Sequence, residues 1–296
     1  MRNFNEDNIT QAVLERLSHC ADARTRQISE ALVRHLHAFV KEIEPSEAEW
    51  ASAIAFLTRT GQMCSDTRQE FILLSDTLGV SMLVDAINHR FAGNATETTV
   101  LGPFYVEEAQ DLPLGAYISH ASDGPPMIVE GSVFDTRGEP IANALIETWH
   151  ADDHGFYDVE RATGKSALDM RARFHADETG HFWYRSIVPV AYPVPNDGPV
   201  GKMLDAQGRH PYRPAHVHFK VSAPGFETIV THVFLEGDAY LDSDVVFGVK
   251  DALIAKLETV EGATSLAGHP ATPGTARLAY RFVLPNSADS AGANNA

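Results

Sequence analysis

The chain has 296 residues, 44% of them hydrophobic and 21% charged, which is typical of a globular protein with enough apolar material for a sizeable core. Its formal net charge of −17 makes it a poor general binder of nucleic acid or of an anionic membrane surface. Its two cysteines exclude a disulfide framework and a thiolate metal cage.

The N-terminal residues, MRNFNEDNITQAV, contain no apolar segment of the kind found in a signal peptide. No run of 18 apolar residues follows in the chain, so no membrane span is expected. Together with the scarcity of cysteine, these features predict a cytoplasmic protein that is not embedded in a membrane.

Four segments before the first Gly- and Pro-rich stretch carry apolar side chains at the spacing of a helix. In the second of them, Ser46 and Glu49 have the spacing of a capping box. Trp50, Ile54 and Leu57 would then form the buried stripe of that helix. The predicted helices are Arg26–Ile43, one that begins after Ser46, Asp66–Leu78 and Ser81–Phe91.

The pattern changes to short strands from Met127 onwards, after a stretch rich in glycine and proline. Regular turns between these strands favour an antiparallel β-sandwich, and Val245–Leu257 alone is predicted to be helical. The predicted strands are Met127–Asp135, Ala144–His150, His181–Val188, Ala215–Ser222, Thr228–Leu235 and Arg277–Leu284. The expected fold class is α+β, with a helical domain in residues 1–103, a β-sandwich in 104–285 and a disordered polar tail in 286–296.

His216 and His218 form the sharpest local feature, because residues two apart on a strand project from the same face. Two imidazoles on one face can bind one metal ion, although two polar side chains on a solvated face give the same pattern. Cysteine is too scarce for a structural zinc site. An iron(II) site with two histidines and a carboxylate stays open, as does an iron(III) site with tyrosine phenolates.

Two tyrosines lie in settings that suit such a ligand. Tyr157 follows a predicted strand through a polar turn, and Tyr192 lies in a loop that Pro189, Pro193 and Pro195 stiffen. The alternative is that both are ordinary half-buried loop tyrosines whose hydroxyls bond to the backbone.

Three motifs taken together resemble the intradiol ring-cleavage dioxygenases, which comprise the catechol, chlorocatechol and hydroxyquinol 1,2-dioxygenases. The motifs are G-F-Y-D-V, P-V-A-Y-P-V-P-N-D-G-P-V-G and R-P-A-H-V-H-F, in this order, and the resemblance runs from Phe71 to Phe282. It implies a β-sandwich that holds a non-haem Fe(III) ion, with Arg213 as an active-site arginine and Tyr192 as a proton acceptor. The implied metal ligands are Tyr157, Tyr192, His216 and His218.

The resemblance also marks a catalytic position at His232, where catechol enzymes usually carry glutamine and hydroxyquinol enzymes resemble this chain. Asp76 resembles an acidic residue of the hydroxyquinol enzymes, and its carboxylate would accept a hydrogen bond from a third ring hydroxyl. A solvent-facing helix residue is the alternative interpretation of Asp76. The implied substrate-pocket residues are Phe71, Leu73, Asp76, Val100, Leu101, Gly102, Pro103 and Phe247.

The resemblance thus implies an oxidoreductase that cleaves hydroxyquinol (1,2,4-trihydroxybenzene) between its vicinal hydroxyls with O2. The product would be 3-hydroxy-cis,cis-muconate, which tautomerises to maleylacetate. Catechol or a chlorocatechol, cleaved to a cis,cis-muconate, is the alternative substrate. The resemblance further implies a homodimer through the N-terminal helices, with a phospholipid bound between the subunits.

Two interpretations of a different class compete with this one. The first is an iron(II) or zinc enzyme that uses His216, His218 and a carboxylate. The second is a β-sandwich without enzymatic activity that only binds partners. Bound metal separates the second from the others, and colour separates the first from a tyrosinate–iron(III) enzyme.

Overall fold

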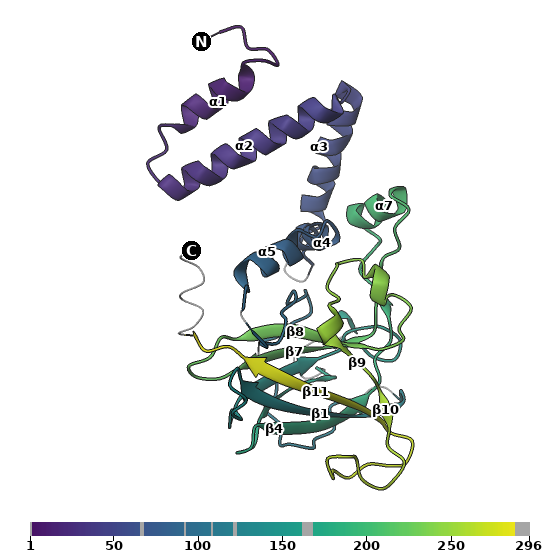
Figure 1. Cartoon of the computed structure of the whole chain (residues 1–296). Coiled ribbons are helices and arrows are strands. Elements are labelled where there is room, and N and C mark those ends of the chain that lie inside the picture. Colours follow the sequence, from purple (N-terminus) through teal and green to yellow (C-terminus); the bar gives the residue numbers. More distant parts are fainter. Residues whose placement is uncertain are drawn as a thin grey trace. The chain divides into compact units, whose positions relative to one another are not determined.

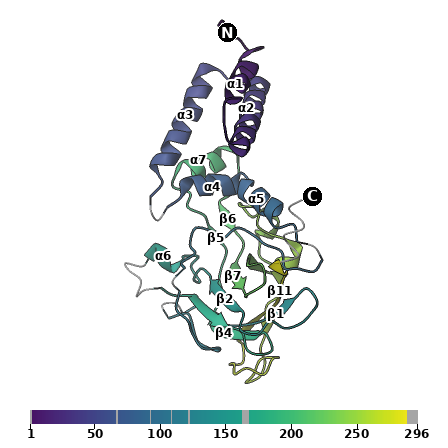
Figure 2. The ribbon, with the colours of Figure 1, turned by 90° about the vertical axis from the view of Figure 1, so that its left-hand side faces the viewer.

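The computed structural model describes residues 2–65, 68–91, 93–107, 109–120, 123–161 and 168–287. The chain separates into two compact units, Met1–Gln62 and Met63–Ala296, whose elements are labelled in Figures 1 and 2. Residues 288–296, which make up most of the expected disordered tail, lie outside the described residues. In the described part of the chain, none of the helices has the length and apolar character needed to cross a bilayer.

The first unit consists of α1 (Ile9–Leu17), α2 (Ala23–Ile43) and α3 (Glu47–Gln62). The predicted capping box is confirmed at the start of α3: the backbone N–H of Ser46 donates to the Glu49 carboxylate (2.8 Å), and that of Glu49 donates to Ser46 Oγ (3.3 Å). The α1 helix was not expected from the sequence.

The large apolar side chains of α2 and α3 are exposed. Trp50 is 62% exposed and Leu32 is 63% exposed, so the expected burial of the Trp50, Ile54 and Leu57 stripe is wrong for the single chain. The helical spacing is present, but a unit of three helices provides almost nothing to cover the stripe, since only Ala12 and Thr60 are buried there. The exposed apolar residues of α2 and α3 are Ile28, Leu32, Leu36, Phe39, Val40, Ile43, Trp50, Ile54 and Leu57.

The second unit begins with α4 (Glu70–Thr77) and α5 (Val80–Asn88). Both are shorter than the predicted helices Asp66–Leu78 and Ser81–Phe91, and α5 begins one residue earlier than predicted. Gly79 joins them with a φ of 73°, a left-handed conformation that glycine adopts without strain. Both helices belong to the compact unit that holds the strands. The domain boundary expected after residue 103 stays a prediction. Two helices that were not expected, α6 (Asp158–Arg161) and α7 (Pro199–Ala206), follow later in the chain.

Two stacked sheets form the body of this unit, in the orders β10-β11-β1-β4 and β3-β2-β7-β8-β9. Figure 1 shows β7 and β8 in one layer and β11, β1 and β4 in the other. All six predicted strands are present: β1 (Pro126–Asp135), β2 (Leu145–Trp149), β4 (His181–Ile187), β7 (His216–Ser222), β8 (Ile229–Leu235) and β11 (Ala276–Leu284). The additional strands are β3 (Arg171–His175), β5 (Tyr192–Pro193), β6 (Tyr212–Arg213), β9 (Ile254–Ala255) and β10 (Glu258–Thr259).

The expected α+β class is confirmed, with two differences from the predicted elements. The β1–β11 and β8–β9 pairs are parallel, so the sandwich is mixed rather than antiparallel throughout. These partners are far apart in the chain, and no hairpin forces them to run in opposite directions. The predicted helix over Val245–Leu257 is wrong, because that segment holds only the 3-10 turn η3 (Asp251–Leu253) and β9. Its apolar periodicity reflects loop residues such as Val245 and Val246 that pack against Leu204.

The core lies between the two sheets and fixes which side chains of β7 face outwards from it. Val217, Phe219 and Val221 are buried in the core together with Phe182 of β4 and Phe282 of β11. Because side chains alternate along a strand, the residues between them point to the opposite face. Figure 2 shows α4, α5 and the β5–β6 pair at one end of the sandwich.

Candidate metal centre and substrate pocket

His216 and His218 project from the same face of β7, as the sequence predicts, and two tyrosines meet them there. The two Nε2 atoms are 3.1 Å apart. Tyr157 Oη lies 2.8 Å from His218 Nε2 and 3.4 Å from His216 Nε2, and Tyr192 Oη lies 3.2 Å from Tyr157 Oη. Four side chains that are distant in sequence therefore direct one oxygen or nitrogen atom each towards a common centre.

The Tyr157 side chain is placed by the turn that follows β2. Asp152 Oδ1 accepts hydrogen bonds from the backbone N–H groups of His154 (2.8 Å) and Phe156 (2.9 Å), which closes the turn. The ring of Phe104 stacks on Tyr157 with centroids 4.4 Å apart. Tyr157 is fully buried in this arrangement, so its ring has a fixed orientation.

Tyr192 reaches the centre through the short β5–β6 pair, in which Tyr192 lies opposite Arg213. Gly155, from the turn before Tyr157, packs so closely that a Cβ atom there would lie 2.7 Å from Tyr192 Cβ. Both contacts place Tyr192 between the Tyr157 turn and the strand that carries Arg213. The proline-rich loop therefore holds Tyr192 at the centre, in line with the rigidity that its prolines indicate.

Both strand histidines are neutral, and His216 offers a lone pair to the centre. His216 Nδ1 lies 2.7 Å from the carbonyl oxygen of Pro214, and because a carbonyl only accepts, Nδ1 carries the proton and Nε2 carries the lone pair. Burial and the nearby charge of Arg213 lower the pKa of His216 to about 3. Burial also lowers the pKa of His218 well below its usual value, and the His218 ring stacks on Trp149 at 4.6 Å.

Without a metal ion, burial favours the neutral, protonated form of both phenols at this centre. Burial raises the pKa of Tyr157 well above its usual value, and burial likewise raises the pKa of Tyr192 against the opposing charge of Arg213. A bound metal ion reverses this preference for the protonated phenol, because the ion binds the phenolate form and displaces the proton. Two phenol oxygens and two imidazole lone pairs around one centre fit a hard, multiply charged ion.

A third histidine borders this centre. His216, His218 and His232 are all buried, and their ligand atoms lie within 4.8 Å of one another, so the three could hold a metal ion. His232 is opposite His218 on β8, with Nδ1 2.9 Å from Thr99 Oγ1 and 3.5 Å from Arg213 Nη2. Since a guanidinium only donates, His232 Nδ1 acts as an acceptor towards Arg213.

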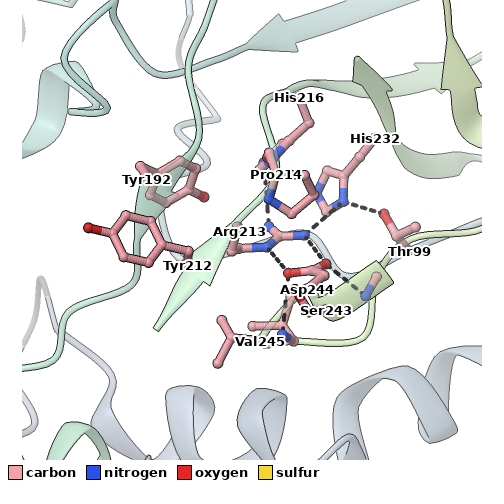
Figure 3. Close-up of polar contacts among 12 residues, drawn as sticks. Thr99, Tyr192, Tyr212, Arg213, Pro214, His216, His232, Ser243, Asp244 and Val245 are labelled. Atoms are coloured by element: carbon pink, nitrogen blue, oxygen red, sulfur yellow. Dashed lines mark hydrogen bonds and ion pairs between the residues drawn. The ribbon is translucent and has the colours of Figure 1, made fainter. Parts of the chain in front are cut away.

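Arg213 is a buried cation held by a carboxylate that the sequence reasoning missed. Its Nε donates to Asp244 Oδ1 (3.1 Å) and its Nη2 donates to Asp244 Oδ2 (3.2 Å), as Figure 3 shows. The Asp244 carboxylate also accepts from the backbone N–H groups of Gly248 (2.9 Å) and Val246 (3.3 Å). Burial alone would raise the pKa of Asp244, but the charge and hydrogen bonds of Arg213 hold it below its usual value. No spacing in the sequence links Asp244 to Arg213.

A pocket opens beside Tyr192 and Arg213, and Asp76 of α4 lies in its wall. Asp76 is 6% exposed, so it is not the solvent-facing helix residue of the alternative interpretation. Burial raises the pKa of Asp76, while a hydrogen bond from Ser81 and the charge of Arg213 act in the opposite direction. Among the expected pocket residues, those that line this pocket are Leu73, Asp76, Val100, Gly102 and Pro103.

Three expected pocket residues lie elsewhere. Phe71 and Leu101 are 47% and 39% exposed and are not part of the pocket lining. Phe247 is 54% exposed and lines a separate hollow together with Arg209. Sequence reasoning also missed the pocket residues Arg68, Gln69, Glu70, Ile72, Phe104, Val194, Pro195 and Val246, most of which lie within a few residues of a motif that it used.

Comparisons with known proteins agree with this geometry. A family model described as the catechol dioxygenase N terminus matches residues 22–96, and one described as dioxygenase matches residues 100–285. The chain is 51% identical over 260 residues to the hydroxyquinol 1,2-dioxygenase of Rhizobium sp. (strain MTP-10005). The matched region covers 88% of each chain. It is 49% identical to the 6-chlorohydroxyquinol 1,2-dioxygenase of Cupriavidus pinatubonensis, over 96% of this chain and 99% of that one.

Among solved structures, the hydroxyquinol 1,2-dioxygenase of Pseudomonas putida DLL-E4 superposes with a TM-score of 0.91 at 46% identity. The superposition covers 95% of this chain and 99% of that one. The family models and these relatives span both compact units. The chain therefore belongs to the family of intradiol ring-cleavage dioxygenases.

Proposed function

We propose that this dioxygenase cleaves hydroxyquinol between its vicinal hydroxyls with O2, giving 3-hydroxy-cis,cis-muconate and, after tautomerisation, maleylacetate. The observation that carries the proposal is the buried Asp76 carboxyl group in the same pocket as Tyr192 and Arg213. A carboxyl group in the pocket wall is a partner for a third ring hydroxyl, which catechol lacks. The names of the relatives at 51% and 49% identity support the same substrate class.

We further propose Fe(III) as the resident metal, held by Tyr157, Tyr192, His216 and His218. The proposal is supported by the convergence of their donor atoms and by the choice of donors, since phenolates favour the ferric over the ferrous ion. When bound, the ferric ion would act as a Lewis acid and template for the two vicinal oxygens and make the ring reactive towards O2.

The other residues of the site bind and orient the substrate. Held as a phenolate by the metal ion, Tyr192 Oη could accept a proton from a diol hydroxyl, because it borders both the metal centre and the pocket. Arg213, fixed by Asp244, would stabilise negative charge on the bound ring by preorganised electrostatics. His232, which neighbours both Arg213 and His218, would add a hydrogen-bonding group at the same place. Val100 and Pro103 provide walls that exclude water.

The metal assignment is tested by the visible spectrum of the purified protein with its iron content measured in parallel. Tyrosinate bound to iron(III) is expected to give an intense visible charge-transfer band that shifts when hydroxyquinol is added. A colourless protein that nevertheless contains one iron or zinc per chain would contradict the tyrosinate ligands. That result would favour an iron(II) or zinc site built on the three histidines.

The substrate assignment is tested by comparing kcat/KM on hydroxyquinol, catechol and a chlorocatechol. A site built to bond a substrate hydroxyl can discriminate by about 10⁴ against an analogue without it, and we expect a preference for hydroxyquinol of at least about 100-fold. Asp76→Leu should remove most of this preference, whereas Leu74→Met, a conservative change on the same helix, should leave it. Equal or better turnover of catechol by the unaltered protein would reject hydroxyquinol as the substrate.

We propose that two copies associate through the exposed apolar residues of α2 and α3. Large apolar side chains exposed at helical spacing are typical of an interface, and Leu32 and Trp50 are more than half exposed in the single chain. Such a surface also suits the acyl chains of a phospholipid held between the subunits. Sedimentation equilibrium tests the dimer, and organic extraction followed by mass spectrometry tests the lipid.

We also propose that the enzyme works in the cytoplasm. The proposal is supported by the scarcity of cysteine, since two cysteines provide no disulfide framework and are typical of a protein in a reducing compartment. Fractionation of the source cells with detection of the protein tests this location.

A further inference from the structure

Arg209 is a partly buried residue that joins two walls of the substrate pocket. Its Nη1 donates to the carbonyl oxygen of Thr77 (2.7 Å), and its Nη2 donates to the carbonyl oxygen of Val245 (3.0 Å). Thr77 is the last residue of α4, where backbone carbonyls have no partner within the helix. One planar guanidinium thus ties the end of α4 to a loop that is far away in the sequence.

Each of these two carbonyls belongs to the residue that directly follows a buried acid. Asp76 precedes Thr77 and lines the pocket, while Asp244 precedes Val245 and holds the Arg213 guanidinium (Figure 3). The acid proposed to bind the third hydroxyl and the acid that orients Arg213 are therefore anchored by the same side chain.

Further contacts hold the Arg209 side chain in the orientation that makes both bonds. Its backbone N–H donates to Leu204 O at the end of α7 (2.9 Å), and its guanidinium carbon lies 5.2 Å from the centroid of the Phe247 ring. Phe247 has a φ of 60°, a backbone conformation that a bulky residue adopts only when its surroundings require it. A lysine in place of Arg209 has a single nitrogen and cannot reproduce the planar bridge in which Nη1 and Nη2 each bond one carbonyl.

We propose that Arg209 is a positioning residue for substrate specificity, which holds Asp76 at its working distance from Arg213 and Asp244. The proposal rests on the proposed hydroxyquinol activity of the same site. The contacts that carry it lie on α4, on α7 and in the loop after Asp244, not on the four proposed metal ligands. A change at Arg209 should therefore affect recognition of the third hydroxyl and leave the metal centre intact.

The first experiment compares Arg209→Gln, Arg209→Lys and the control Lys202→Gln, which removes one charge from the exposed face of α7. For Arg209→Gln we expect KM for hydroxyquinol to rise about tenfold, the scale of one lost hydrogen bond to a charged group, with a smaller change in kcat. The kcat/KM for catechol should change less than about twofold, because catechol has no third hydroxyl to be positioned. The visible spectrum of the iron-loaded protein should stay unchanged.

The KM of Arg209→Lys for hydroxyquinol should lie between those of the unaltered protein and Arg209→Gln. The KM of Lys202→Gln should match that of the unaltered protein. Thermal unfolding of each variant is measured alongside, and Arg209→Lys carries the test if Arg209→Gln does not fold. An equal loss on both substrates would show that Arg209 has only a structural role and would overturn the proposal. If Arg209→Gln left kcat and KM for both substrates unchanged, the proposal would be overturned as well.

A double-mutant cycle tests whether Arg209 acts through Asp76. In an Asp76→Asn background, Arg209→Gln should have little further effect on the preference for hydroxyquinol, because residues that act through one contact are not additive. The same tenfold effect in both backgrounds would contradict the proposal. The hydroxyquinol function itself is judged separately, by the preference of the unaltered protein, and the Arg209 proposal by the ratio of variant to unaltered protein on each substrate.

Discussion

The helical unit and the sheet unit of this protein depart from an ordinary globular domain in opposite directions. Residues 2–62 expose large apolar side chains, with Leu32 and Trp50 more than 60% exposed and only Ala12 and Thr60 buried. The sheet unit instead buries polar and charged groups, including Arg213 and Asp244, within an otherwise apolar fold. Exposed apolar surface and buried polar groups are both costly unless something else covers or binds them.

The exposed apolar surface and the buried polar groups call for two different kinds of binding partner. The apolar stripe of the helices can be completed by a second apolar surface, which is why we propose that two copies associate there. The buried imidazoles and phenols can be completed by a cation, because their donor atoms already face one point. The next four experiments test this contrast, beginning with the largest expected effect.

Removing a proposed metal ligand should prevent the sheet unit from retaining the metal ion. We expect His216→Ala to retain little iron and to lose at least about 1000-fold in kcat/KM, since a bound metal contributes several kcal/mol to catalysis. Metal analysis, the visible spectrum and turnover are measured together. His175→Ala, a half-exposed histidine on β3, is the control and should behave as the unaltered protein. A His216→Ala protein with full iron content and an unchanged spectrum would remove His216 from the ligand set.

Placing charge on the apolar stripe should separate the copies without affecting the metal centre. Leu32→Glu with Leu36→Glu is expected to weaken association about 1000-fold, because central interface residues contribute about 2 kcal/mol each. Sedimentation equilibrium measures the shift from dimer to monomer. Ala38→Glu adds a charge on the opposite side of α2 and is the matched control. If the double variant remains dimeric, the copies do not associate through this stripe.

Acid should destabilise the sheet unit through buried histidines that lie outside the metal centre. His150 bonds to Ala151 O and Ser186 Oγ at 2.7 Å each, and burial lowers its pKa to about 4. Between pH 6.5 and 4 the unfolded chain therefore binds a proton at this residue that the folded chain does not, and stability falls by roughly 3 kcal/mol as the pH is lowered.

His150→Gln should remove that part of the slope when the free energy of unfolding is measured against pH. His154→Gln, in the same loop but with a side chain 71% exposed, should leave the slope unchanged. A slope that is identical in the unaltered protein and in His150→Gln would mean that His150 titrates normally in the folded state.

The smallest expected effect concerns the helical unit. Ser46→Ala removes the capping hydroxyl of α3 and should lower its stability by about 1 kcal/mol. Hydrogen exchange at the first turn of α3 should increase, while exchange along β7 should not. Ser46→Asn, which can still cap the helix, should restore most of the protection. Equal exchange in the alanine and asparagine variants would show that the cap contributes little.

Local patterns in the sequence were sufficient for several features of this fold. The capping box of Ser46 and Glu49 is confirmed, as is the common face of His216 and His218, because both depend on residues two or three apart. The six longer strands follow from their apolar content and the turns between them. Short strands such as β5 and β9 were missed, since two residues carry no periodicity and pair only where the tertiary structure brings them together.

The sequence by itself determined α2 to α5, the six longer strands, and the family motifs that mark Tyr157, Tyr192, His216 and His218. The tertiary structure alone decided which groups meet: it paired Arg213 with Asp244, placed Asp76 in the pocket wall and left Phe247 beside Arg209. It also decided that the apolar stripe of α2 and α3 stays uncovered in a single chain. The physical reason is range, because helical and strand periodicity is written in neighbouring residues, whereas burial and ion pairing depend on segments that only the folded chain brings together.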